Sequence, residues 1–364
     1  MLAAMPNTAG RLRDDPPAPP PGTRLSGVAL GIDVGGTGVK AGLVDLATAE
    51  LVTDRIREKT PQPSKPEAVA ATIGSVVSRV LAEHPDIPAD LPVGCGLPGV
   101  VKDGRLTTAA NIDHEWVGWA AEDGIGAAIG RRVLIINDAD AAGLAEVAYG
   151  AGEGAAGTLL LLTIGTGIGS AVFIDGILVP NTEFGHIELK GRDAESRVSG
   201  AARERRGIGW KAWAREFDLY LSHLELYLQP DLIILGGGVS KEMAKFGKYL
   251  EASAPIVTAR YLNTSGIIGA AYAAAFAQRI EKAGPTASAA GRRRLAKGDP
   301  GTYGELPGKG ATALRRSRKP VAAAEPGPLA GAAPSAAEPV AAASPGAKAA
   351  EPGAAAAAAK PPEG

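Results

Sequence analysis

The chain has 364 residues, with 38 Lys and Arg, 39 Asp and Glu, and a formal net charge of −1. This balance excludes a wholly basic nucleic-acid binder, and the length allows one large domain or two of ordinary size. Cys95 is the only cysteine, which excludes an intramolecular disulfide and a cysteine-based zinc site. No apolar run reaches the roughly 18 residues of a membrane span, and residues 1–22 lack the apolar core of a signal peptide. We therefore expect a cytoplasmic protein that does not bind membranes.

Composition divides the chain into three zones. Residues 1–26 are rich in proline, and residues 283–364 form an Ala/Pro-rich, low-complexity tail with basic clusters at 292–294 and 315–319. Both zones have too few large apolar side chains to offset the entropy lost on ordering, so we predict that they are disordered. Residues 27–282 alternate apolar runs with turn signals, which predicts a folded domain.

Within this domain the predicted elements mix strands and helices. Apolar runs predict strands at residues 28–34, 39–46, 93–97, 133–136, 158–164, 170–174 and 232–235. Apolar residues at helical spacing predict helices at residues 66–84, 139–149, 210–228 and 267–280. The first two strands are separated by a glycine-rich turn and are expected to form a hairpin. Continuous apolar strands mixed with helices indicate an α/β fold with sheet covered on both faces.

The first segment with chemical potential is the hairpin turn, where a carboxylate precedes a run of small residues: Asp33, Gly35, Gly36, Thr37, Gly38 and then Lys40. The glycines let backbone N–H groups approach a phosphate closely, and Thr37 adds a hydroxyl donor. Asp33 would be repelled by phosphate, so we expect it to act through Mg²⁺, most simply through bound water. The segment is not a Walker A loop, which needs a Gly-Lys-Ser/Thr ending. An ordinary glycine hairpin is the alternative.

A second segment repeats this pattern of strand, glycine turn and strand with Gly165, Thr166, Gly167 and Gly169. Two such turns are expected if two related subdomains each contribute a phosphate-facing hairpin. A Rossmann dinucleotide site is the alternative, but the residues after the turn favour a strand over a helix, and an acidic ribose partner is not evident.

Two further candidates lie at the ends of apolar strands. Asn137 and Asp138 end one strand, at the edge of an α/β sheet where ligands bind, and Asp138 is placed to accept the proton of an attacking hydroxyl. A helix N-cap is the alternative for both, although we expect Asp140 to be the better cap. Another strand ends in Gly236, Gly237 and Gly238, where an extended ligand can lie against the backbone, although this signal alone is weak.

A polar loop at residues 181–188, followed by Glu195, combines carboxylates with an imidazole. Vicinal sugar hydroxyls require paired acceptors and a donor, and Glu183 and His186 supply both. One histidine with several glutamates does not have the spacing of a closed metal site. A solvated loop is the alternative.

In this order, the five segments resemble the ROK family of sugar kinases, within the actin-like ATPase superfamily, over residues 27–282. The resemblance implies two ribonuclease H-like subdomains with a cleft between them, formed by residues 27–137 plus 267–282 and by residues 138–266. It implies that both glycine turns hold the phosphates of the donor and that residues 236–240 lie on its adenosine side. The sugar-binding residues that it implies are Asn137, Asp138, Glu183 and His186, with Asp138 as the catalytic base.

This sequence departs from the family pattern at one point, which concerns metal binding. Typical members follow the histidine with a cysteine-rich zinc loop, and here the cysteines are absent. The sequence after residue 194 is similar to the remainder of that motif, so the resemblance assigns the third sugar carboxylate to Glu195 and predicts that zinc is not bound.

The lost zinc loop and the residues around 111–116, 137–146 and 178–183 are most similar to the polyphosphate-using glucokinases of the family. This resemblance implies glucose as acceptor, polyphosphate and ATP as donors, Mg²⁺ as cofactor and a homodimer. The alternatives are an ATP-only hexose or N-acetylhexosamine kinase and, more distantly, a sugar-responsive regulator. The sequence before residue 27 is too short and proline-rich for a helix-turn-helix, so specific nucleic-acid binding is not expected. For the basic tail we hypothesise a tether for polyphosphate.

Overall fold

A computed structural model of the protein describes residues 23–109 and 111–283. Its folded part begins before residue 27, because Leu25 is only 7% exposed and the hydroxyl of Tyr272 donates to the carbonyl of Thr23 at 2.8 Å. The rest of the proline-rich arm and all but Ala283 of the tail lie outside the described residues. The predictions of disorder and of a polyphosphate tether concern those residues and stay predictions.

The first main sheet of the described residues has six strands in the order β3-β2-β1-β5-β8, with β4 also paired to β2. Its strands are β1 (Val28–Gly35), β2 (Gly38–Asp45), β3 (Glu50–Leu51), β4 (Ile56–Glu58), β5 (Val93–Leu97) and β8 (Leu134–Asn137). β1 and β2 form the predicted antiparallel hairpin, whereas β5 runs parallel to both β1 and β8. The carboxyl ends of β1, β5 and β8 therefore lie at one edge of this sheet.

The second main sheet has the order β11-β10-β9-β12-β13 in the described residues. Its strands are β9 (Thr158–Ile164), β10 (Ile168–Ile174), β11 (Ile177–Val179), β12 (Leu232–Gly236) and β13 (Ile256–Thr258). β9 and β10 are antiparallel and β12 runs parallel to β9, which repeats the arrangement of β1, β2 and β5. A small two-stranded sheet is formed by β6 (Val101–Lys102) and β7 (Arg105–Leu106).

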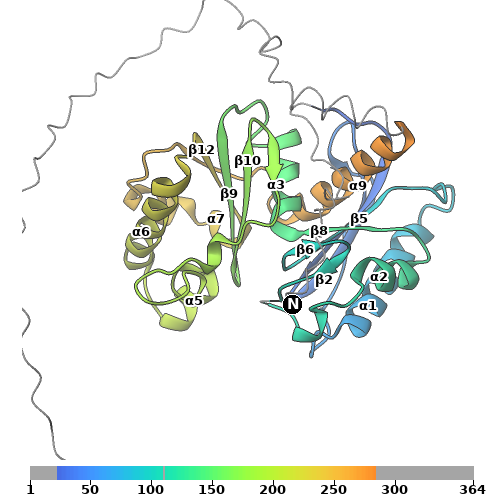
Figure 1. Ribbon diagram of the computed structural model, residues 1–364, viewed down its shortest axis with the longest axis horizontal. Helices are drawn as coiled ribbons and strands as arrows, with labels where there is room; N and C mark the ends of the chain where they lie inside the picture. Colours follow the sequence, from blue (N-terminus) through green and yellow to red (C-terminus); the bar gives the residue numbers. More distant parts are fainter. Residues whose placement is uncertain (1–22, 110, 284–364) are drawn as a thin grey trace, which may run out of the picture. The chain divides into compact units, whose positions relative to one another are not determined.

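Helices separate and cover the two main sheets (Figure 1). α3 (Asp138–Tyr149) and α9 (Ser265–Ala283) share a core cluster with residues of both sheets, among them Val44 and Phe173. α1 (Pro66–Ala82) and α2 (Ala121–Ile129) cover the other face of the first sheet, and α6 (Trp210–Leu228) covers the other face of the second. The short helices are α4 (Glu195–Val198), α5 (Gly200–Arg206), α7 (Gly237–Ser240) and α8 (Met243–Phe246).

Glycines allow α3 and α9 to approach their neighbours. A Cβ at Gly31 or Gly94 would overlap the backbone carbonyls of α9, and one at Gly269 would overlap the carbonyl of Ala141 in α3. Any larger side chain at these points would push the layers apart, because the opposing atoms are backbone. Close packing therefore fixes the N-termini of α3 and α9, which both lie at the candidate site.

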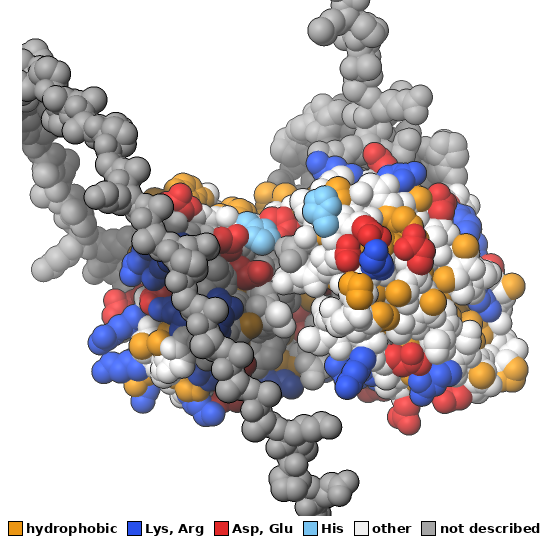
Figure 2. Space-filling view, turned by 90° about the horizontal axis from the view of Figure 1, so that it is seen from below, with side chains coloured by type: hydrophobic (Ala, Val, Ile, Leu, Met, Phe, Trp, Pro, Cys, Tyr) orange, Lys and Arg blue, Asp and Glu red, His pale blue; other side chains and the backbone are white. Residues whose placement is uncertain are grey.

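The structure agrees with most predicted elements and differs at some boundaries. The predicted strand at 158–164 and helix at 210–228 are confirmed, while the last helix is longer than expected and β4, β11, β13 and α2 were not predicted. No helix among the described residues has the length and apolarity to cross a membrane. Side chains of both charges occur together over the face in Figure 2. The division into subdomains 27–137 plus 267–282 and 138–266 stays a prediction.

Candidate functional site

Asp138 lies at the centre of the candidate site, as the first residue of α3 directly after strand β8. Asn137 is the N-cap of this helix, and its Oδ1 accepts hydrogen bonds from the N–H groups of Ala139 and Asp140 at 2.9 and 3.0 Å. The expectation that Asp140 is the cap is therefore wrong. Asp140 lies inside the helix, 1% exposed, and its Oδ2 accepts from the N–H of Asn181 at 2.8 Å.

The surroundings of Asp138 make its carboxyl more basic than usual. Burial, followed by the negative charge of Asp33 and then of Glu183, raises its pKa to about 7, against an opposing hydrogen bond from the N–H of Ala139. A carboxyl with this pKa exists in both protonation states near neutral pH, which suits a general base that takes a proton from a hydroxyl.

Asp33 reaches this region from the end of β1. Its Oδ2 accepts from Nζ of Lys40 at 2.6 Å, and the neighbouring residues of β1 and β2 are paired across the hairpin. The first turn of α9 lies against it, since a Cβ at Gly266 would be 2.9 Å from its Cγ. Asp33 thus precedes the first glycine turn (residues 35–38), and it lies close enough to Asp138 for its charge to raise the pKa of that residue.

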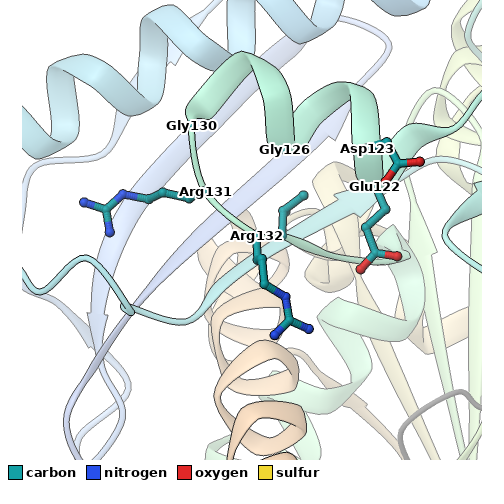
Figure 3. A pocket seen from close by; sticks show the side chains of 7 residues that line it. Glu122, Asp123, Gly126, Gly130, Arg131 and Arg132 are labelled. Carbon is teal, nitrogen blue, oxygen red and sulfur yellow. The ribbon is translucent and has the colours of Figure 1, made fainter.

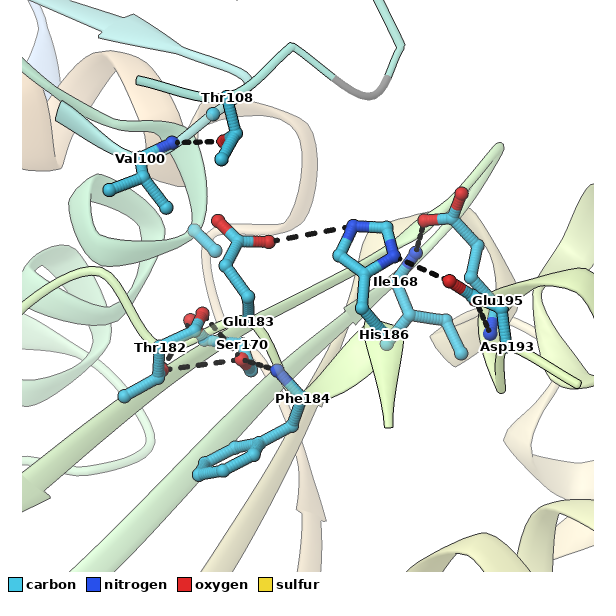
Figure 4. A network of polar contacts seen from close by, with 12 residues as sticks. Val100, Thr108, Ile168, Ser170, Thr182, Glu183, Phe184, His186, Asp193 and Glu195 are labelled. Carbon is cyan, nitrogen blue, oxygen red and sulfur yellow. Dashed lines mark hydrogen bonds and ion pairs between the residues drawn. The ribbon is translucent and has the colours of Figure 1, made fainter. Parts of the chain in front are cut away.

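Glu183, His186 and Asp193 form a connected polar group (Figure 4). Oε1 of Glu183 accepts from Nδ2 of Asn137 at 3.3 Å, its Oε2 is 3.8 Å from Nε2 of His186, and Nδ1 of His186 is 2.7 Å from Asp193. Burial raises the pKa of Glu183. Burial alone lowers the pKa of His186, but its hydrogen bond to Asp193 and the charges of Asp193, Glu195 and Glu183 together raise it.

The segment that carries Glu183 is held on both sides. The Ser170 hydroxyl donates to the carbonyl of Thr182 at 2.7 Å and accepts from the N–H of Phe184 at 3.0 Å (Figure 4). The side chain of Asn181 bonds both backbone groups of Val101, at 2.8 and 3.0 Å. These hydrogen bonds hold the loop in place, although His186 and Glu188 within it are exposed to solvent.

The second glycine turn (residues 165–169) connects antiparallel β9 and β10, so the Rossmann alternative, which needs a following helix, is wrong. Oε2 of Glu195 accepts from the N–H of Ile168 at 2.8 Å, so Glu195 supports this turn as well as facing the polar group. Asn111 lies near both turns, because a Cβ at Gly36 would be 3.0 Å from its carbonyl oxygen and one at Gly167 would be 2.8 Å from its Nδ2.

The residues 236–238 also lie beside the second turn. Gly237 has φ of +74° and starts α7, and a Cβ there would overlap the backbone of Ile164. A Cβ at Gly200 would be 2.9 Å from both the carbonyl of Gly165 and the side chain of Val239 in α7. The structure therefore brings together all the predicted groups, in two linked sets: one around Asp33, Asp138 and Glu183, the other around the second turn.

Sequence reasoning missed the side chains of Arg57, Thr60 and Gln62, which bind the first glycine turn, and gave no role to Asn181 or Asp193. A three-residue strand such as β4 has no periodic signal, and Thr60 and Gln62 stand beside prolines that are typical of a loop. Only the conspicuous polar content of residues 181–195 could have drawn attention to the other two.

A cavity elsewhere does not belong to this site. It has a volume of about 450 Å³ and lies beside α2, where it is lined by Glu122, Asp123, Gly126, Gly130, Arg131, Arg132 and Val133 (Figure 3). The guanidinium of Arg131 donates to the carbonyls of Pro88 and Ala89, and that of Arg132 is paired with Glu281. Because these cations are already engaged and none of the predicted residues lines the cavity, we assign it no role.

Comparison with known proteins identifies the family of the chain. The ROK family model matches residues 29–203. The chain is 47% identical to the polyphosphate glucokinase of Mycobacterium tuberculosis over 254 residues, which cover 70% of this chain and 93% of that protein. The inorganic polyphosphate/ATP-glucomannokinase from Arthrobacter sp. strain KM superimposes with a TM-score of 0.66 at 46% identity, covering 68% of this chain and 98% of that one.

A ROK family glucokinase from Streptomyces griseus, solved in complex with glucose and AMPPNP, superimposes with a TM-score of 0.58 at 26% identity. The match covers 68% of this chain and 99% of that chain. These similarities confirm the predicted α/β fold class of the actin-like ATPase superfamily. On its sequence and its fold alike, the chain belongs to the ROK family of sugar kinases.

Proposed function

We propose that the protein is a glucokinase that transfers a phosphoryl group from inorganic polyphosphate, or from ATP, to the 6-hydroxyl of glucose. The observation that carries the proposal is a base at the right place: Asp138, with a pKa of about 7, lies next to Asp33 and Glu183. The high identity to a polyphosphate glucokinase supports the choice of substrates. The similarity to a glucomannokinase that uses polyphosphate and ATP supports two donors.

The acceptor sugar is proposed to lie between Asp138 and the polar group of Glu183, His186 and Asp193. Asn137 and Glu183 already bond each other, and His186 is held in place by Asp193, so these groups keep their positions before the sugar arrives. Pre-positioned donors and acceptors reduce the entropy lost in aligning the hydroxyl for attack. Asp138 then accepts the hydroxyl proton as the oxygen attacks the terminal phosphorus. Glu195 is proposed as a third sugar ligand.

The donor is proposed to lie along both glycine turns and, for ATP, against residues 236–238. We propose Mg²⁺ as cofactor, with Asp33 as the residue that holds it through water. One carboxylate with several waters is a usual protein contribution to a magnesium site, because Mg²⁺ keeps much of its hydration and takes its other ligands from phosphate. Magnesium would neutralise the charge that develops on the transferred phosphoryl group. From the family resemblance we also propose a cytoplasmic homodimer.

An assay of the purified protein with each donor separately tests the proposal. We expect glucose 6-phosphate to form from glucose with ATP alone and with long-chain polyphosphate alone. Turnover with ATP only would support the ATP-dependent hexose kinase instead. Absence of turnover with both donors, in a folded protein supplied with Mg²⁺, would overturn the proposal.

A further inference from the structure

The three consecutive backbone carbonyls of the first glycine turn are each bound by a side chain from one short segment. Oγ1 of Thr60 donates to the carbonyl of Gly35 at 2.6 Å. Nε2 of Gln62 donates to the carbonyl of Gly36 at 3.3 Å, and Nη2 of Arg57 donates to the carbonyl of Thr37 at 3.1 Å. Thr60 is 5% exposed, so its bond is shielded from water.

The strand pairing of β4 explains why this segment reaches the turn. β2 leaves the turn at Gly38, and β4 returns antiparallel to it, with Arg57 opposite Lys40 and Glu58 opposite Val39. Residues 59–62 continue in the same direction and therefore pass alongside the turn. The segment is held in place by the sheet, independently of any ligand.

These bonds decide which groups the turn offers to a ligand. A carbonyl oxygen carries partial negative charge and repels phosphate, whereas an N–H attracts it. With the three carbonyls engaged by residues 57–62, the N–H groups of Gly36 and Thr37 donate no hydrogen bond within the described residues. The carbonyl oxygens of the turn therefore have hydrogen-bond partners, whereas these two N–H groups are available to donate to an anion.

The charges beside the turn also favour the binding of an anion. Arg57 and Lys40 are opposite each other in the sheet, and like charges at opposed positions destabilise a strand pair. Lys40 is neutralised by Asp33 at 2.6 Å, whereas Arg57 is exposed and has no carboxylate partner among the described residues. A guanidinium has five N–H groups in a planar fork that matches two phosphate oxygens. Most of these donors have no partner in the described part of the chain and are available to a ligand.

Gly38 leaves room for this position of the guanidinium. A Cβ there would lie 2.7 Å from Nε of Arg57, so a larger residue would require this exposed side chain to move.

We infer that Arg57 is a ligand of the donor's phosphate chain and that Thr60 and Gln62 are positioning residues that orient the first glycine turn toward it. The guanidinium N–H groups of Arg57 that do not bond the carbonyl of Thr37 bind a phosphoryl group, beside Lys40. This inference rests on the proposed function, since it adds residues to the same donor site.

Kinetic constants of Arg57→Ala and Arg57→Lys in the full chain test the role of Arg57. We expect Arg57→Ala to raise KM for ATP and for polyphosphate by about tenfold or more, because a hydrogen bond to a charged group contributes about 1.5–3 kcal/mol. KM for glucose should stay within about twofold. Arg57→Lys should recover only part of the loss, since an ammonium keeps the charge and lacks the fork.

Arg55→Ala is the matched control. Arg55 is also exposed and lies two residues earlier, but its guanidinium donates to the carbonyl of Asn263 at 3.4 Å and not to the turn. Its replacement should leave both donor KM values unchanged. Equal losses in the Arg55 and Arg57 variants, or a change confined to KM for glucose, would overturn the inference.

Thr60→Val and Thr60→Ser separate the positioning role from simple packing. Valine keeps the shape of the buried side chain and removes the hydroxyl that bonds Gly35, whereas serine keeps that hydroxyl. We expect Thr60→Val to raise both donor KM values and Thr60→Ser to remain near the wild type. If valine and serine have the same effect, the hydroxyl does not orient the turn.

Calorimetric titration with sodium tripolyphosphate and Mg²⁺, without sugar, keeps this test apart from the proposed function. Wild-type and Arg55→Ala proteins should bind with equal affinity, and Arg57→Ala should bind about tenfold more weakly or worse. This result would support the anion site even if the protein failed to phosphorylate glucose. Equal affinity of all three proteins would overturn the inference even if glucose were phosphorylated.

Discussion

The carboxylate of Asp140 accepts a hydrogen bond from the backbone N–H of Asn181 at 2.8 Å, which joins α3 to the loop that carries Glu183. Asn181 takes the left-handed conformation, with φ of +61°, and its side chain bonds Val101 in β6. The other carboxylate oxygen of Asp140 is buried and has no hydrogen-bond partner among the described residues. This combination favours a protonated, neutral carboxyl two residues after the proposed base.

The pH dependence of stability tests this state of Asp140. Burial, together with the charges of Asp138 and Glu183 and against the hydrogen bond from Asn181, raises the pKa of Asp140 from 3.8 to about 8. The folded state thus binds this proton more tightly than the unfolded state. The stability that the protonated carboxyl of Asp140 contributes is therefore complete below about pH 4 and is lost as pH rises to about 8. Asp140→Asn removes this loss.

Unfolding by urea at a series of pH values provides the measurement. Relative to the wild type, the free energy of unfolding of Asp140→Asn should rise between pH 4 and pH 8, by on the order of 1 kcal/mol or more, since one pKa unit corresponds to about 1.4 kcal/mol. An effect of the substitution on stability that is the same at every pH does not alter how this difference changes with pH. A difference that does not change with pH would mean that Asp140 is ionised in the folded protein throughout this range.

The pH dependence of the reaction tests Asp138 in the same way. Because burial and the charges of Asp33 and Glu183 raise its pKa to about 7, a base at this position is protonated and inactive at lower pH. We expect kcat/KM for glucose to fall about tenfold for each pH unit below pH 7 and to level off above it. A profile that stays flat through pH 7 would contradict this role.

The metal requirement separates the proposed site from that of zinc-containing relatives of the family. Removal of Mg²⁺ with a chelator should abolish turnover, and added Mg²⁺ should restore it, because charge on the transferred phosphoryl group would otherwise be uncompensated. A zinc-selective chelator should have no effect, since His186 has no cysteine ligands near it in the sequence. Stoichiometric zinc that is lost together with activity would show the assignment of this loop to be wrong.

The sequence predicted the fold well where local patterns are strong. Both glycine hairpins and the parallel strand that follows each of them were recognisable, because apolar runs and glycine turns are local features. It predicted poorly what depends on long-range contacts. Asn137 was considered as a cap, but Asp140 was wrongly preferred, because Asn and Asp are equally good caps and only burial and the contact with Asn181 remove Asp140 from that role.

In the candidate site, too, local features could be predicted and long-range contacts could not. Asp33, Asp138 and Glu183 were predicted from their places at strand ends and in a polar loop, and the structure places their charges close enough to affect one another. The bonds from Arg57 and Gln62 to the first turn could not be predicted, since they depend on a three-residue strand returning beside β2. Such short strands are defined by their partners and not by their own residues.

The most direct test of the account is kcat of Asp138→Asn with glucose, measured with ATP and with polyphosphate as separate donors. The substitution is nearly isosteric and removes the base, so we predict a fall of about 100-fold or more with both donors, with an unchanged fold. Asp123→Asn, an equally conservative change at an exposed position of α2 away from the site, should keep wild-type activity. Near-normal kcat with either donor in a well-folded Asp138→Asn protein would contradict the central claim.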